Sequence, residues 1–61
     1  MRIYVENPGG ILWLCDWIVA AGMDHPQFTD NVLYAMRFDR LRQTMPYVMR
    51  LKEMGYAPHV T

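Results

Sequence analysis

The stretch Gly10–Ala21, GILWLCDWIVAA, is the longest apolar segment of the chain, and only Asp16 interrupts it with a charge. At about 100° per residue, its apolar side chains fall into helical stripes. One stripe contains Ile11, Leu14, Cys15 and Ile18. A second stripe, roughly 130° around the cylinder, contains Trp13, Trp17 and Ala20. This pattern predicts a helix over Gly10–Ala21 that ends at Gly22, a residue that favours the left-handed C-cap conformation.

A helix that is apolar on nearly all sides needs cover on nearly all sides. The chain has only 61 residues, and a domain of this size buries only about 60% of the surface of its unfolded chain. We therefore expect a second subunit or a partner protein to complete the burial. The prediction is a homodimer with the helix over residues 10–21 at or near its interface.

The first six residues alternate between apolar and polar side chains, with Met1, Ile3 and Val5 on one side. This period of two predicts a half-buried strand or extended arm, which the turn residues 7–10 bring to an end. One short strand is unstable without a partner. Its partner is either the C-terminal tail, residues 56–61, or a strand from a second copy of the chain.

The segment after Gly22 predicts a second helix. Asp24 and Gln27 have the spacing of a capping box. A competing start lies at residues 29–30, because Thr and Asp are unfavourable inside helices. From either start the helix is expected to run to about Gln43.

Pro46 predicts a break in helical structure, because proline disfavours helical geometry at the residue before it, here Met45. A third helix is expected over Pro46–Met54, with Thr44 as its cap. Gly55 is placed for a C′ glycine at its end.

These segments predict one small domain, residues 1–61, of mainly α structure: a short N-terminal strand or arm followed by three helices, assembled as a homodimer. The single cysteine, Cys15, excludes an intramolecular disulfide. The N-terminus lacks the pattern of a signal peptide, so we expect a reducing compartment, the cytoplasm. The apolar run is shorter than the roughly 20 residues of a bilayer span, so no membrane partner is expected.

The formal net charge of zero hides an asymmetry along the chain. Residues 1–30 contain one arginine against four acidic residues, a net charge of −3. Residues 31–61 contain five basic residues against two acidic ones, a net charge of +3. These halves could neutralise each other within a subunit, between two subunits, or against a partner.

Catalytic and metal-binding patterns are weak. Cys15, His25 and His59 lack the paired spacing that places two ligands on one ion. A nucleophile also needs a base within hydrogen-bond reach, and Cys15 lies on a predicted apolar stripe. We expect no enzyme activity, no catalytic residues, no metal, no cofactor and no small-molecule substrate.

Protein recognition is the function that the composition favours, because Trp, Tyr and Arg are the residues that most often anchor interfaces. We expect a small non-catalytic regulator or inhibitor that masks a site on a larger protein. Its size is common among phage and mobile-element effectors, and we expect such an origin. The candidate partner-binding residues are Trp13, Trp17, Tyr34, Arg37, Arg40, Arg42 and Tyr47.

The alternative is a small regulator that binds DNA through a helix-turn-helix. The predicted helices over residues 24–43 and 46–54 are joined by a short break, as in that motif. However, the second of them offers only Arg50 and Lys52 as strong donors, and no Asn or Gln for reading adenine. Nucleic acid is therefore the less favoured partner.

Overall fold

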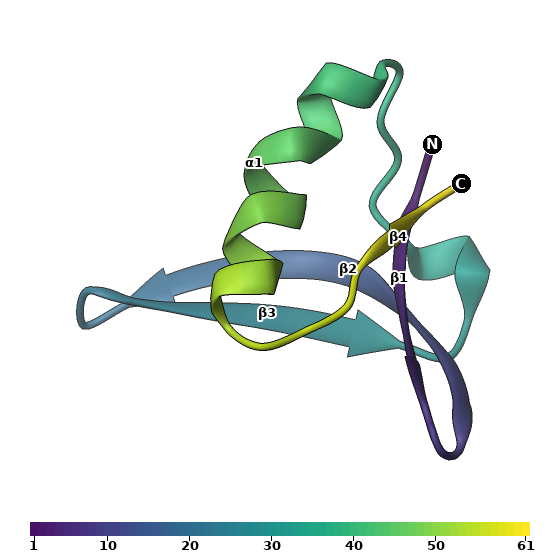
Figure 1. Cartoon of the computed structure of the whole chain (residues 1–61), viewed down its shortest axis with the longest axis horizontal. Coiled ribbons are helices and arrows are strands. Elements are labelled where there is room, and N and C mark those ends of the chain that lie inside the picture. The colour runs from purple at the N-terminus through teal and green to yellow at the C-terminus, as the bar shows by residue number, and fades with distance from the viewer.

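The computed structural model describes all 61 residues and shows a four-stranded antiparallel sheet with one α-helix packed on one of its faces (Figure 1). The order of the strands in the sheet is β3-β2-β1-β4. The chain termini lie side by side and are joined by backbone hydrogen bonds between Arg2 and Thr61. The elements are β1 (Ile3–Asn7), β2 (Gly10–Ala20), β3 (Met23–Thr29), the 3₁₀ turn η1 (Val32–Tyr34), α1 (Leu41–Glu53) and β4 (His59–Val60).

The predicted mainly α fold with three helices is therefore wrong. The segment expected to form the first helix is strand β2, and the one expected to begin the second helix is strand β3. The segment between η1 and α1 is also not helical. Its backbone is tied to the strands instead, through Met36 N donating to Leu14 O (2.9 Å) and Phe38 N donating to Met1 O (2.8 Å).

A β-bulge interrupts the alternation of inward and outward residues in β2. Leu14 pairs with Phe28, but Asp16 pairs with Gln27, so Cys15 is an extra residue in the strand. The bulge keeps both Leu14 and Trp17 on the helix-facing side of the sheet, although they are three positions apart in the chain. A step of three between inward residues breaks the period of two by which a strand is recognised in a sequence.

Tight turns at both ends of β2 close the two hairpins. Between β1 and β2, the side chain of Asn7 accepts a hydrogen bond from Gly9 N (2.9 Å), and Gly10 has a φ of 129°. Between β2 and β3, Ala21 and Gly22 have φ values of 53° and 73°. Positive φ at both central residues is the mark of a type I′ turn, whose twist matches that of the strands.

The N-terminal strand predicted from its alternation is confirmed, because Ile3 and Val5 are buried in β1. Its partners lie within the chain: β2 on one side and the C-terminal β4 on the other, with Ile3 opposite Val60. At the far edge of the sheet, β3 contains Pro26. Proline is tolerated in an edge strand because a missing amide hydrogen can face outward there.

The start of α1 differs from the prediction. The helix begins at Leu41 and continues through Pro46 without the predicted break. Its first turn is capped by the side chain of Gln43, whose Oε1 accepts from the backbone N–H of Asp39 (2.9 Å) and of Arg40 (3.0 Å). Thr44, expected as a cap, is buried inside the helix and donates to Leu41 O (2.6 Å).

The end of α1 matches the prediction. Gly55 has a φ of 94° and donates its N–H to Lys52 O (3.0 Å). Tyr56 N donates to Leu51 O (3.0 Å). These two bonds form a Schellman motif, which a glycine at C′ makes available at low cost.

The core between α1 and the sheet is small. Only 7 of the 61 residues are buried, whereas 13 large hydrophobic side chains are exposed, so folding leaves much apolar surface uncovered. At 13 residues, α1 falls short of the length needed to cross a bilayer. The core consists of Ile3, Leu14, Val48 and Leu51, with partly buried Trp17, Phe28, Met36, Phe38, Tyr47 and Val60 around them.

Candidate functional site

The outer parts of β2 and β3, residues 16–27, form a hairpin that projects past α1, here called the arm (Figure 1). Its end, Ile18–Met23, is called the arm tip and contains no polar side chain. Val19 is 66% exposed, Met23 is 62% exposed and Ile18 is 46% exposed. A continuous run of exposed apolar residues is unfavourable in water and marks an interaction site.

The arm tip is apolar on both of its faces. Val19 lies opposite Asp24 on the face of the sheet that carries α1, whereas Ile18 lies opposite His25 on the other face. Met23, paired with Ala20, shares the face of Ile18. A tip that is apolar on both sides is suited to a cavity that surrounds it rather than to a flat surface.

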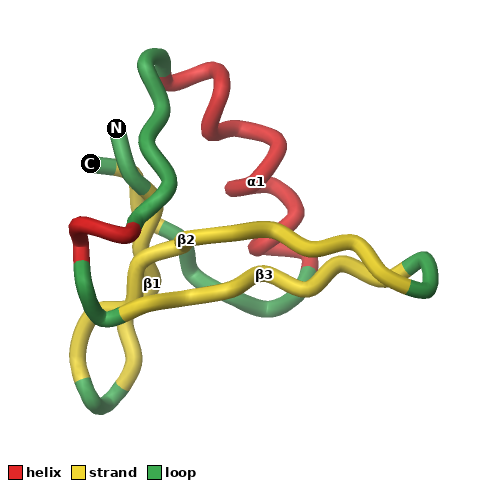
Figure 2. The backbone as a smooth tube through the Cα atoms, turned by 180° about the vertical axis from the view of Figure 1, so that it is seen from behind, coloured by secondary structure: helices red, strands yellow, loops and turns green.

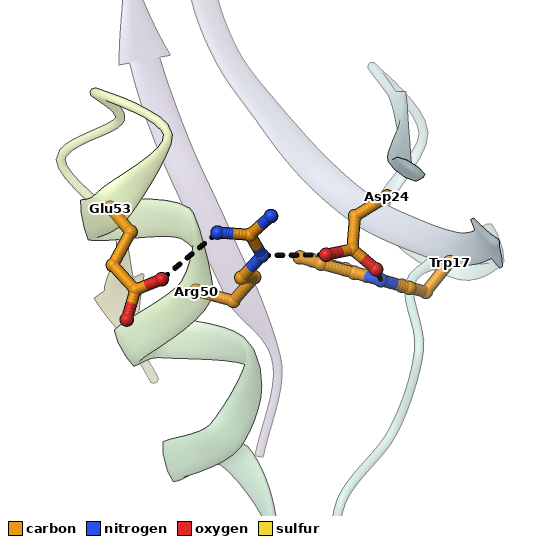
Figure 3. A network of polar contacts seen from close by, with 4 residues as sticks. All are labelled: Trp17, Asp24, Arg50 and Glu53. Atoms are coloured by element: carbon orange, nitrogen blue, oxygen red, sulfur yellow. Dashed lines mark hydrogen bonds and ion pairs between the residues drawn. The ribbon is translucent and has the colours of Figure 1, made fainter. Parts of the chain in front are cut away.

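A polar network joins the arm to the helix (Figure 3). The carboxylate of Asp24 accepts a hydrogen bond from the indole of Trp17 (Nε1–Oδ1, 3.1 Å). It also forms an ion pair with Arg50 (Nε–Oδ2, 2.5 Å). Arg50 also pairs with Glu53 (Nη1–Oε2, 2.9 Å). The Trp17 ring packs edge-on against Tyr47 of α1, with centroids 5.4 Å apart. The base of the arm is thus held by both polar and aromatic contacts.

The network favours the charged forms of its members. Hydrogen bonds from Arg50 and then from Trp17 lower the pKa of Asp24 below the ordinary value of 3.8. The pKa of Arg50 is raised by its hydrogen bonds to Asp24 and to Glu53. At neutral pH the arm is therefore attached to α1 by an ion pair.

We expect this ion pair to make stability depend on pH. The pKa of Asp24 is lower in the folded chain than in the unfolded chain, so its carboxylate stabilises the fold above the unfolded value. That stabilisation is lost as the pH falls through the folded value. Urea unfolding from about pH 7 to about pH 3 should show a steeper loss in the natural chain than in Asp24→Asn. Parallel pH curves for the two proteins would contradict the assignment.

A row of aromatic rings lies on the sheet face opposite α1. Tyr4 packs between Trp13 and His59, with centroid distances of 5.2 Å and 4.9 Å. The imidazole Nε2 of His59 lies 4.0 Å from a carboxylate oxygen of Glu6. Trp13 and Trp17 lie on opposite faces of the sheet, so the helical stripe that was predicted to contain both does not form.

The other predicted partner-binding residues are dispersed. Tyr47 is partly buried and packs between Trp17 and Phe38. Tyr34 is exposed in η1. The three predicted arginines lie just before α1 or in its first turn, and no ion pair joins them to the chain. They are Arg37, Arg40 and Arg42. The start of α1 is far from the arm tip in both views (Figures 1 and 2).

Sequence reasoning missed the arm tip and the network at its base. Ile18 was assigned to a core stripe, and Asp24 was assigned to a helix cap. The available signal was the Ala21–Gly22 pair between two apolar segments, which is compatible with a hairpin turn. The pairing of Asp24 with Arg50 has no local signal, because 26 residues separate them.

The alternative sites are not assembled as expected. The chain has one α-helix, so it contains no helix-turn-helix. Cys15, weighed as a nucleophile, donates its thiol to the backbone carbonyl of Gln27 (3.4 Å) at the bulge. No protein-family model, curated protein or solved structure matches the chain. The functional interpretation therefore depends on the geometry of the arm.

Proposed function

We propose that this protein is a small, non-catalytic regulator or inhibitor, acting in the cytoplasm, that masks a site on a larger protein by inserting its arm tip. The observation that carries the proposal is the exposed apolar run Ile18–Met23. It lies at the end of a hairpin whose base is joined to α1 by an ion pair. Complete burial of a large aliphatic side chain is worth about 1.5–3 kcal/mol. Because the tip side chains are half exposed, roughly 1–2 kcal/mol each remains available for binding.

The contacts at the base of the arm support this proposal. A loop that becomes ordered on binding loses conformational entropy and therefore affinity. Here the turn at Ala21–Gly22 already has a defined conformation. The base of the arm is fixed to α1 through Asp24 and Arg50.

The charge around the arm favours a protein partner over an anionic one. Residues 3–36 contain no lysine or arginine, whereas Asp16, Asp24 and Asp30 lie among them. An anionic membrane surface attracts basic segments, and a nucleic acid is bound through lysine and arginine contacts to its phosphates. An uncharged apolar tip between aspartates fits a protein cavity better than either.

The decisive experiment compares the natural chain with Ile18→Asp/Met23→Asp as baits in a lysate of the source cells treated with nuclease. Both side chains are exposed, so the variant should fold normally by circular dichroism. We expect it to bind the captured protein about 100-fold more weakly, since two apolar anchors worth about 1.4 kcal/mol each are lost.

Leu33→Asp is the matched control, because Leu33 is an exposed apolar residue in η1, outside the arm. It should bind the captured protein as the natural chain does. Equal binding by the tip variant, or loss of the captured protein after nuclease treatment, would overturn the proposal.

A further inference from the structure

The outer side of α1 carries a second apolar surface, distinct from the arm. Leu41, Met45 and Met49 are between 42% and 58% exposed. Their spacing of four residues places them along one side of the helix. This set is called the helix stripe. It contributes nothing to the core, which α1 reaches through Thr44, Val48 and Leu51.

Charged residues lie at both ends of the helix stripe: Arg42 near its start, and Lys52 and Glu53 near its end. Arg42 and Glu53 are 11 residues apart in α1, which is about three helical turns, so they lie on the same side of the helix. Arg42 makes no ion pair within the chain. Glu53 uses only Oε2 toward Arg50, and its side chain is 63% exposed. Each charge is therefore free to pair with a partner.

We propose that the helix stripe binds a second copy of this chain as an antiparallel, two-fold symmetric helix pair. In this arrangement Met45 of each copy contacts Met49 of the other, and Arg42 of each copy faces Glu53 of the other. A parallel pair would instead place Arg42 beside Arg42. The antiparallel pair also places Arg42, at the positive end of its own helix dipole, beside the negative end of the partner helix. Two-fold symmetry closes the assembly at a dimer.

The dimer is expected to be weak. A stable interface buries about 800 Å² on each partner, and three half-exposed side chains with their flanking charges supply less. The dimer would matter for function because α1 contacts the partner copy through a side that leaves both arm tips free. A dimer would present two tips, and two linked contacts raise apparent affinity for a target with two sites.

Sedimentation equilibrium at low salt, from about 10 μM to about 1 mM protein, tests the proposal on the chain alone. The natural chain should show an average mass that rises with concentration toward that of a dimer. Met45→Glu/Met49→Glu should remain a monomer throughout, with unchanged circular dichroism because both side chains are exposed. A natural chain that stays monomeric, or a variant that associates equally, would overturn the proposal.

A charge-reversal cycle tests the antiparallel arrangement. Arg42→Glu and Glu53→Arg should each weaken association about tenfold, because each changes two ion pairs in the dimer to like-charge contacts. Arg42→Glu/Glu53→Arg should recover the natural dissociation constant within about threefold. Arg37→Glu, the same charge change outside α1, should leave association unchanged. Failure of the double variant to recover, or a loss with Arg37→Glu, would overturn the arrangement. Neither result depends on the arm tip.

Discussion

Leu51→Ala is expected to lower the free energy of unfolding by about 3 kcal/mol. Leu51 is fully buried in α1 and packs with Ile3, Leu14 and Val48 in the core cluster. Alanine would remove its transfer free energy and leave a cavity that the surrounding strands fill only in part. At about 0.05–0.15 kcal/mol per residue, a chain of this length has roughly 3–9 kcal/mol of stability in total. The variant should therefore lose about a third or more of the stability of the chain.

Urea denaturation followed by tryptophan fluorescence measures this loss. Trp17 lies beside the core and reports on its integrity. Met49→Ala is the matched control, because Met49 lies two residues away in the same helix but is exposed. Its stability should change by less than about 0.5 kcal/mol. Similar losses in the two variants would show that α1 does not pack on the sheet through Leu51.

Pro46→Ala is expected to raise the free energy of unfolding by about 1–2 kcal/mol. Pro46 lies inside α1, where it removes the hydrogen bond to the carbonyl four residues earlier, at Arg42. Proline inside a helix costs about 3 kcal/mol relative to alanine. The expected gain is smaller here because Pro46 lies as early as the second turn of α1. Alanine also removes no core contact, since Pro46 is exposed.

The same urea titration tests this prediction, performed at low protein concentration so that association does not contribute. Lys52→Ala serves as the reference for an exposed alanine in α1, and it should change stability by less than about 0.5 kcal/mol. A decrease in stability for Pro46→Ala would mean that the proline supports the helix in its present position.

The parts of the fold that were predictable from sequence are those in which neighbouring residues decide the conformation. The alternation of Ile3 and Val5 with polar residues marked β1 as a half-buried strand. The glycine at position 55 marked the end of α1, where its N–H bonds to Lys52 O across three residues. Each of these signals lies within a few residues of the structure that it predicts.

The errors were made where two conformations share one pattern. The residues of β2 fit a helical stripe and a bulged strand equally well, and a bulge has no reliable signature in a single sequence. The same ambiguity caused the error in the predicted partner-binding site. Helical spacing placed Trp13 beside Trp17, whereas the strand placed Trp13 with Tyr4 and placed Trp17 under α1.

The sequence by itself determined the small apolar domain, its N-terminal strand, its helix end and the asymmetry of its charge. The tertiary structure alone decided that residues 10–29 form a hairpin, because the hydrogen bonds of a strand are completed by another segment of the chain. It also decided that Asp24 meets Arg50, 26 residues away. The apolar segment Gly10–Ala21 needed cover that a short chain could not supply in full. The structure locates much of the uncovered part at the arm tip, where the hairpin extends beyond the helix, and leaves Ile11 exposed near the other end of β2.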